Sequence, residues 1–288
     1  MNRVSTTPSI LEQWWQQARH SSDVNRLIVR YLEIHYRQAA FMTSAELARA
    51  VGVSQASISR FASLLGFTGY ADWNKSMQQV IRQELSAAER LWFAKHPRSD
   101  EGDRVIQSEQ ENVDQLLQIT DSPAFSALAA HMAQAKEVIF VSARASATLM
   151  PYAHYFLSKV RPRVYQTQPG DPLWEHLAIS DVQNVLIVAL GFPRYPRVLV
   201  ELLQDLHKRT FTIGVLTDHE TSPLARYANM ALAVPVATAS LFDSYAAPIT
   251  AINLLIREVA QQTTTQSQSR LAALEMMDQD KHIYYSET

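Results

Sequence analysis

The chain has 288 residues, of which 47% are hydrophobic and 19% charged, with 26 basic against 28 acidic side chains. This composition is that of a globular protein with one large domain or two ordinary ones, and it excludes a long disordered chain. The absence of cysteine excludes disulfides and thiolate metal sites and fits a reducing cytosol, and no apolar run approaches the roughly 20 residues of a membrane helix.

The first 90 residues predict helices only. They carry a net charge of +3, whereas residues 91–288 carry −5, which hints at a polyanionic partner, although three charges also fit chance variation. A first helix follows the polar start at Ser21–Asp23. Its apolar face is predicted to consist of Leu27, Ile28, Tyr31, Leu32 and Ile34.

Residues 44–65, which read SAELARAVGVSQASISRFASLL, have the pattern of a helix-turn-helix. Thr43 and Glu46 have the spacing of a capping box at the start of the first helix, and Gly52 ends that helix. Ser54 can cap the second helix, which is predicted to run to Leu65. A further helix is expected from Asp72 through Leu85.

The second helix of this pair divides into two faces. Ile58, Phe61, Ala62 and Leu65 recur at the helical period and predict a packed face, which leaves a slim polar face that suits a DNA major groove. We expect contact with bases or phosphates from this face and its flanks, with Gln55 suited to adenine and Arg60 to guanine or phosphate. The expected DNA-binding residues are Ser44, Ser54, Gln55, Ala56, Ser57, Ser59, Arg60 and Ser63. A purely structural helical hairpin is the alternative.

Beyond this region the pattern changes to alternating strands and helices. Residues 1–85 are predicted to form the DNA-binding domain and 86–120 a partly helical linker, interrupted at 96–103 by proline, glycine and charge. Five apolar runs follow, at residues 137–143, 163–168, 184–190, 211–217 and 230–236. Helices are expected at 148–160, 172–179, 195–209, 223–228 and 245–262.

This alternation predicts an α/β domain over residues 121–262. Its five-stranded parallel sheet would lie between helices in a three-layer αβα arrangement, with a ligand site beyond the carboxyl ends of the strands. In the last helix, Ile249, Ile252, Leu255, Ile256 and Val259 are expected in the domain core or a subunit interface. Residues 263–288 are predicted to be a polar tail with a short helix near Leu271–Met277.

A family resemblance adds to this interpretation. The segment Phe41–Met77, FMTSAELARAVGVSQASISRFASLLGFTGYADWNKSM, resembles the N-terminal domain of the RpiR (MurR) family of bacterial transcription regulators. The stretch Leu64–Tyr70 is the most specific part, because a generic helix-turn-helix does not require it. The resemblance implies a C-terminal sugar-isomerase-type (SIS) domain that binds a phosphosugar and mediates oligomerisation. We therefore expect a homodimer or homotetramer on a double-stranded DNA operator.

The resemblance also locates the expected effector site, and the chain departs from the family there. The first loop reads VSARAS over Val141–Ser146, without the family's glycines but with Ser146 at its serine. The second loop reads GFPRYPR over Gly191–Arg197, without the family's serines and threonine. Arginine forks and a tyrosine suit a carboxylate or another small anion as well as a phosphosugar. The expected effector-binding residues are Ser142, Arg144, Ser146, Gly191, Arg194, Tyr195, Asp243 and Ser244.

Simpler roles are open for several of these residues. Asp243 is equally suited to cap the last helix, and the two arginines to a solvated surface. We expect a ligand-responsive regulator that is not an enzyme, with no catalytic residues, no cofactor, no metal and no membrane contact. The alternative is a SIS-type sugar-phosphate isomerase or lyase with an accessory helical domain. A third interpretation is an architectural DNA-binding protein with an inactive sensor domain.

Overall fold

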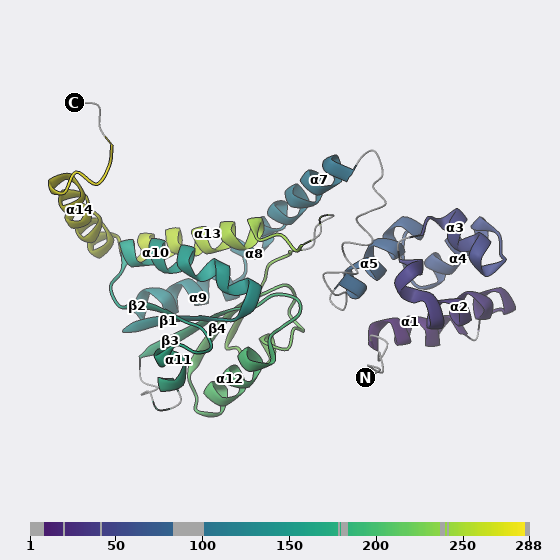
Figure 1. The fold of residues 1–288 in the computed structure, drawn as a ribbon, viewed down its shortest axis with the longest axis horizontal. Coiled ribbons are helices and arrows are strands. Elements are labelled where there is room, and N and C mark those ends of the chain that lie inside the picture. The colour runs from purple at the N-terminus through teal and green to yellow at the C-terminus, as the bar shows by residue number, and fades with distance from the viewer. Residues whose placement is uncertain are drawn as a thin grey trace. The chain divides into compact units, whose positions relative to one another are not determined.

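The computed structural model describes residues 9–19, 21–40, 42–82, 101–177, 179, 184–236, 240 and 242–285. The chain forms two compact units, Met1–Pro97 and Arg98–Thr288 (Figure 1). Each unit has hydrophobic clusters of its own, which is the hallmark of separate domains.

The N-terminal unit is helical throughout its described residues. Its helices are α1 (Ser9–Arg19), α2 (Asp23–Ala39), α3 (Ser44–Val51), α4 (Gln55–Leu64) and α5 (Tyr70–Arg82). Leu11 and Trp15 of α1 join Phe61 and Trp73 in one buried cluster. Helix α1, which the sequence pattern did not predict, is therefore part of this core.

The buried face of α2 differs from the predicted one. Ile28 and Leu32 are buried as expected, but the side chains of Leu27 and Ile34 are 51% and 69% exposed. The core-facing residues are Ile28, Val29, Leu32, Tyr36 and Ala39. Their spacing follows the helical period, whereas Leu27 and Ile34, seven residues apart, share a side of the helix that faces away from the core.

The ends of the helix-turn-helix are fixed by the predicted caps. The Thr43 hydroxyl accepts the Glu46 amide at 3.2 Å, and the Glu46 carboxylate accepts the Thr43 amide at 2.7 Å, which completes the capping box. Gly52 ends α3 with φ of 80°, a left-handed conformation that glycine adopts without a Cβ penalty. The Ser54 hydroxyl accepts the Ser57 amide at 3.2 Å at the start of α4.

The distinctive stretch after α4 packs α5 onto the helix-turn-helix. The Tyr70 hydroxyl donates to the Met42 carbonyl at 2.7 Å, and the Tyr70 ring lies 5.6 Å from that of Trp73. The Asp72 carboxylate accepts the Thr68 amide at 3.0 Å. These contacts give the residues of this stretch specific packing and hydrogen-bonding roles that a generic turn does not require.

The C-terminal unit contains one parallel sheet in the order β2-β1-β3-β4-β5. The strands are β1 (Glu137–Ser142), β2 (Val164–Thr167), β3 (Val185–Leu190), β4 (Thr212–Thr217) and β5 (Met230–Ala233). The longer helices are α7 (Glu101–Asp114), α9 (Pro123–Gln134), α10 (Met150–Val160), α12 (Arg197–Lys208), α13 (Ala246–Gln262) and α14 (Thr264–Asp280). Shorter helices are α8 (Leu116–Thr120) and α11 (Pro172–His176), with 3₁₀ turns at Arg144–Leu149 and Ala225–Tyr227.

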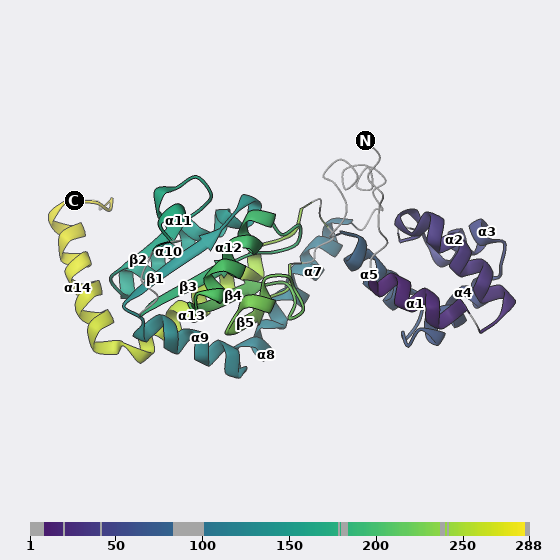
Figure 2. The same cartoon turned by 90° about the horizontal axis from the view of Figure 1, so that it is seen from below.

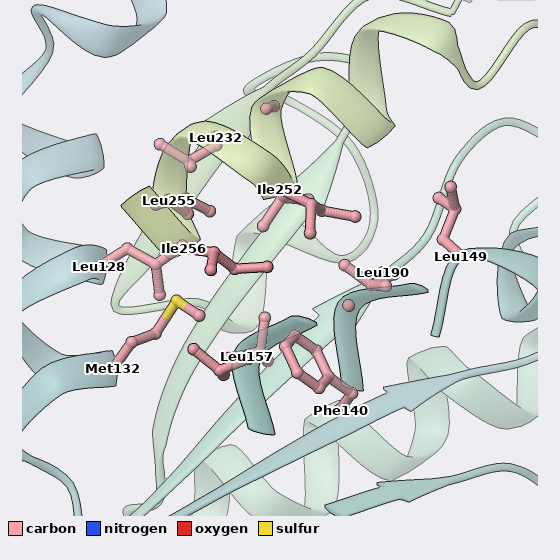
Figure 3. Close-up of a cluster of buried hydrophobic side chains, with 14 of the residues drawn as sticks. Leu128, Met132, Phe140, Leu149, Leu157, Leu190, Leu232, Ile252, Leu255 and Ile256 are labelled. Atoms are coloured by element: carbon pink, nitrogen blue, oxygen red, sulfur yellow. The ribbon is translucent and has the colours of Figure 1, made fainter. Parts of the chain in front are cut away.

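Helices cover both faces of this sheet, as the continuous apolar runs predict (Figures 1 and 2). Val138 and Phe140 face the layer of α9, α10 and α13, and Ile139 and Val141 face the layer that contains α12. Figure 3 shows the first of these clusters, in which Leu128 and Met132 of α9 meet Ile256 of α13. The three-layer αβα prediction is therefore confirmed.

Several element limits differ from the prediction. The helix expected at 148–160 is a 3₁₀ turn followed by α10, α11 ends at His176, and the segment 223–228 forms only a 3₁₀ turn. The last strand ends at Ala233 instead of residue 236, although the Val234 amide still donates to the Thr217 carbonyl at 2.7 Å. Pro235, which has no amide hydrogen, cannot extend this ladder.

The segments on either side of the sheet domain are more helical than expected. Residues 86–100 of the predicted linker lie outside the described residues, but α7 and α8 belong to the C-terminal unit, and Leu116 is buried in its core. In the predicted tail, α14 spans 17 residues, because the Ser267 hydroxyl donates to the Val160 carbonyl at 3.1 Å and Arg270 Nε to the Ser158 carbonyl at 2.7 Å. The residue limits of the domains themselves stay predictions.

Candidate DNA-reading helix and anion site

The polar face of α4 is exposed on the N-terminal unit. Ser54, Gln55, Ala56, Ser59, Arg60 and Ser63 are all exposed there, and the opposite residues Ile58, Phe61 and Ala62 are fully buried. Ser57, which was expected at the flank of this face, is only 9% exposed. Its oxygen lies 2.8 Å from that of Ser54 and accepts Arg60 Nη2 at 3.2 Å.

Hydrogen bonds hold the two principal candidates for base contact in defined positions. Gln55 Nε2 donates to the Ser44 hydroxyl at 2.7 Å, which joins the start of α4 to the start of α3. Arg60 is tethered to Ser57, one turn earlier on α4. Ser44 and Ser57 thus orient the side chains that are expected to reach DNA, and their own contact with DNA stays a prediction.

In the C-terminal unit, β1 and β3 are neighbours whose connections leave in opposite directions. Such a switch point of a parallel sheet leaves a crevice at the carboxyl ends of its two central strands, where ligands bind in open α/β folds. Arg144 follows β1 after one intervening residue, Ala143, and Arg194 lies in the loop that follows β3. The two predicted loops therefore meet at this edge.

Both arginines have an unusual backbone conformation. Their φ angles are 62° and 67°, in the left-handed region that residues with a Cβ rarely adopt. Both side chains are exposed, and neither forms a hydrogen bond or ion pair with another described residue. Strained positions are often retained where a side chain serves function, and two uncompensated guanidinium groups favour an anion.

Two other predicted residues have structural roles in the same loops. Ser142 is fully buried, and its hydroxyl donates to the Leu190 carbonyl at 2.6 Å. This hydrogen bond joins β1 to β3 and uses the proton that was expected to bind an anion. A Cβ at Gly191 would lie 2.1 Å from Leu224 Cδ1. Glycine is therefore needed there for close packing.

Ser146 joins three loops of the site. It is 4% exposed, its oxygen accepts the Phe192 amide at 3.2 Å, and it lies 3.3 Å from the Tyr245 hydroxyl. The Tyr245 ring lies 5.5 Å from that of Phe192. The loops after β1 and β3 and the residue before α13 are thereby held together, as the sequence predicts for these three stretches.

The neighbour of Asp243 caps the last helix, and a capping role of Asp243 itself stays a prediction. The Ser244 hydroxyl accepts the Ala246 amide at 3.2 Å in the first turn of α13. Asp243 is close enough to Tyr195 for its negative charge to contribute to a raised pKa of that phenol. Asp243 is therefore part of the surroundings of Tyr195.

Tyr195 belongs to a polar cluster that the sequence analysis missed. Its hydroxyl donates to the Asp218 carboxylate and lies 3.4 Å from His219 Nε2, which is itself 3.5 Å from Asp218 Oδ2. Burial, followed by the bond to Asp218, raises the pKa of Tyr195 well above its usual value. Their position in the sequence could have indicated that Asp218 and His219 belong to this edge, because they directly follow Thr217 at the carboxyl end of β4.

Neither a metal centre nor a membrane span is found in the described parts of the chain. Among those residues, histidine and carboxylate side chains form no group of three that could hold a metal ion. No described helix is both long enough and apolar enough to cross a bilayer. The candidate residues at this edge of the sheet are arginines, serines, a tyrosine and an aspartate.

Two family models match the chain, one in each unit. Residues 9–84 match the helix-turn-helix domain of the rpiR family, and residues 131–257 match the SIS domain. An uncharacterized HTH-type transcriptional regulator in the aarA 3′ region of Providencia stuartii is 25% identical over 236 residues, which are 80% of each chain.

Solved structures share the fold. The sugar isomerase domain of an RpiR transcription factor from Sphaerobacter thermophilus has a TM-score of 0.58 and 23% identity, and the match covers 62% of this chain and 99% of that one. The Vibrio vulnificus NanR protein complexed with ManNAc-6P has a TM-score of 0.56 and 16% identity, over 93% and 97% of the two chains. With both domains matched in the expected order, the chain belongs to the RpiR family of helix-turn-helix transcriptional regulators that carry a SIS domain.

Proposed function

We propose that this regulator reads DNA with the exposed face of α4 and responds to a small anion held between Arg144 and Arg194. The observation that carries the sensor half is the pair of arginines, both left-handed and both without a partner among the described residues. The exposure of Gln55, Ser59 and Arg60 supports the DNA-binding half. We also propose that the protein is located in the cytoplasm, which is consistent with a DNA-binding role.

The DNA-binding half is tested by titrating the full chain onto the DNA upstream of its own gene. Arg60→Ala should raise the dissociation constant for this DNA about tenfold, because the loss of one good arginine contact to a base weakens binding by about that factor. The matched control is Arg26→Ala, since Arg26 is an exposed arginine of α2 that is already paired with Asp23. Equal binding by the Arg60 and Arg26 variants, or no salt-sensitive binding by the wild type, would contradict this assignment.

One α4 helix spans only a few base pairs, so we propose a homodimer or homotetramer that reads two half-sites. Sedimentation of the full chain should give a mass of two or four subunits of 32.5 kDa. A monomer that binds the operator with full affinity would contradict the proposal.

The proposed effector carries a phosphate or a carboxylate group. The family implies a phosphosugar, and the V. vulnificus relative was solved with ManNAc-6P. In this chain the second loop offers Arg194 in place of the family's serine and threonine hydroxyls, and a guanidinium group suits either kind of anion. Gly191 and Ser142 support these loops, while Asp243 and Ser244 would border the ligand near α13.

Calorimetry with inorganic phosphate and with citrate separates the two kinds of anion. Arg144→Ala and Arg194→Ala should each weaken binding of the preferred anion by about tenfold. Arg163→Ala serves as the control, because Arg163 is also exposed with a positive φ but precedes β2 at the opposite edge of the sheet. Binding that is unchanged in the first two variants would refute the arginine site.

A sugar-phosphate isomerase is the second candidate, and the Tyr195–Asp218–His219 cluster is the observation in its favour. Isomerisation requires a positioned base, and His219 lies at the same edge of the sheet as the arginines. We expect no interconversion when aldose and ketose phosphates are incubated with the protein and followed by NMR. Turnover that is lost in His219→Ala would favour the enzyme.

A further inference from the structure

Tyr195 is attached to the end of a strand other than the one it follows. It lies next to Arg194 in the loop after β3, and its hydroxyl donates to the carboxylate of Asp218, which directly follows β4. A tyrosine hydroxyl has a single proton, so this bond leaves Tyr195 no proton to offer an anion. The side chain is therefore suited to hold the loop in place.

The same loop is also fixed on the other side of Arg194. Phe192 is 1% exposed, and its amide donates to the Ser146 oxygen at 3.2 Å. The Gly191 amide donates to the Leu216 carbonyl at 3.0 Å, which joins the start of the loop to β4. The loop is thus held two residues before Arg194 by these bonds and one residue after it by the tyrosine.

Between these fixed points, Arg194 has most of the backbone freedom. Proline rings fix φ at Pro193 and Pro196, and the second proline also biases Tyr195 toward extended conformations. Arg194 has neither restriction, yet its φ is 67°, which is unfavourable for a residue with a Cβ. Such a conformation persists where the surrounding structure holds it. Loss of the bond from Tyr195 should therefore let Arg194 leave this conformation.

We propose that Tyr195 and Asp218 are positioning residues of the anion site, which hold Arg194 in its binding conformation and do not bind the anion themselves. This inference rests on the proposed function. His219 belongs to the same cluster, because its Nε2 lies 3.4 Å from the Tyr195 hydroxyl and 3.5 Å from Asp218 Oδ2. The cluster thereby has a role in ligand binding that requires no catalytic step.

Calorimetry of the full chain tests the proposal, with inorganic phosphate or citrate as the probe, whichever binds more tightly. Tyr195→Phe should weaken binding about fivefold, because release of one left-handed residue lowers the population of the binding conformation by about that factor. Asp218→Ala should weaken binding to a similar extent. Asp218→Asn should bind at least as tightly as the wild type, because its amide oxygen still accepts the Tyr195 proton and the negative charge is removed.

Tyr227→Phe is the matched control for the loss of a tyrosine hydroxyl. Tyr227 packs on the same hydrophobic cluster as Tyr195, and its hydroxyl forms no hydrogen bond with a described residue. This variant should bind the anion like the wild type.

Double-mutant cycles separate a positioning role from general damage to the domain. If Tyr195 acts through Arg194, Tyr195→Phe should have no further effect on affinity in an Arg194→Ala protein. In an Arg144→Ala protein, which keeps Arg194, the same change should again weaken binding about fivefold. A purely structural defect would weaken binding in both backgrounds.

The outcomes distinguish this inference from the proposed function. If neither anion binds the wild type, or if Arg194→Ala binds as tightly as the wild type, the anion site is refuted and the positioning role fails with it. If Arg194→Ala weakens binding but Tyr195→Phe does not, the site stands and the positioning role is overturned. Equal losses in Asp218→Asn and Asp218→Ala, or equal effects of Tyr195→Phe in the two arginine backgrounds, also overturn it. Tyr195→Phe and Asp218→Asn were chosen because each keeps the size of the side chain.

Discussion

Arg161 is expected to be the most important single charge for the stability of the C-terminal domain. It is 7% exposed, and its guanidinium donates to the carbonyls of Met132 and Ala135, the latter at 2.6 Å. These carbonyls lie at the end of α9, where the helix offers no partner of its own. Burial lowers the pKa of Arg161, but an arginine stays charged, so its removal leaves two buried acceptors unsatisfied.

Arg161→Met keeps the length of the side chain and removes every donor. Counting only the two bonds above, at about 1.5 kcal/mol each for a charged donor, we expect a loss of about 3 kcal/mol. For a domain of this size that corresponds to a melting temperature lower by about 6–12 °C. Arg161→Lys should lose about half as much, because one ammonium group cannot reach both carbonyls in the same geometry.

Differential scanning fluorimetry of the full chain measures this effect on the transition of the C-terminal unit. Arg163→Met is the matched control, because Arg163 is two residues away and exposed, and it should change the melting temperature little. The reasoning is refuted if Arg161→Met and Arg163→Met melt together, or if the lysine and methionine variants are equally destabilised.

Three further predictions concern other contacts. Gly214→Ala should lower the melting temperature by several degrees, because the new Cβ would lie 2.4 Å from Leu128 Cδ1, and the loss should shrink in a Leu128→Ala background, which a double-mutant cycle measures. Thr43→Ala should destabilise the N-terminal unit by about 1 kcal/mol by removing the capping box, whereas Thr68→Ala, which leaves the backbone bond to Asp72, should cost less in urea unfolding. The pKa of Tyr195 is raised in the folded state, so the stabilisation that the Tyr195 hydroxyl provides is complete below about pH 10 and declines at higher pH. The melting temperature of the wild type should therefore exceed that of Tyr195→Phe by a smaller margin at about pH 11 than at about pH 8.

Local patterns predicted the sheet and the helix caps well for identifiable physical reasons. The run Val185–Leu190 is apolar at every position, and Thr212–Thr217 is buried at every position but its first, because helices cover both faces of the sheet. The Thr43–Glu46 cap is a contact within four residues, so the sequence contains both partners. The length of helix α14 was underestimated because its first half is rich in threonine, glutamine and serine. Its ordering depends on tertiary contacts with α10.

From the sequence, a residue could be placed in the candidate site only where it follows closely on the end of a predicted strand. Arg144 and Arg194 each follow an apolar strand within a few residues, so their position at the ligand edge was visible in the sequence. The partnership of Tyr195 with Asp218 was not, because 23 residues separate them and only the adjacency of β3 and β4 brings them together. The bond from Ser142 to the neighbouring strand could not be predicted either, because a serine at a strand end can point to a ligand or to the next strand.

The departures from the family pattern are concentrated at one place, and this argues that they belong together. Ser146, at the position of the family's serine, accepts the Phe192 amide and contacts Tyr245, and arginine occupies a left-handed position in each of the segments that follow β1 and β3. Both arginines lie at the exposed carboxyl edge of the sheet without a partner among the described residues, where they add little to the core. Stabilisation of the wild type by phosphate or citrate, absent from an Arg144→Ala/Arg194→Ala double variant, is the outcome that an active sensor requires and that an architectural DNA-binding protein would not give.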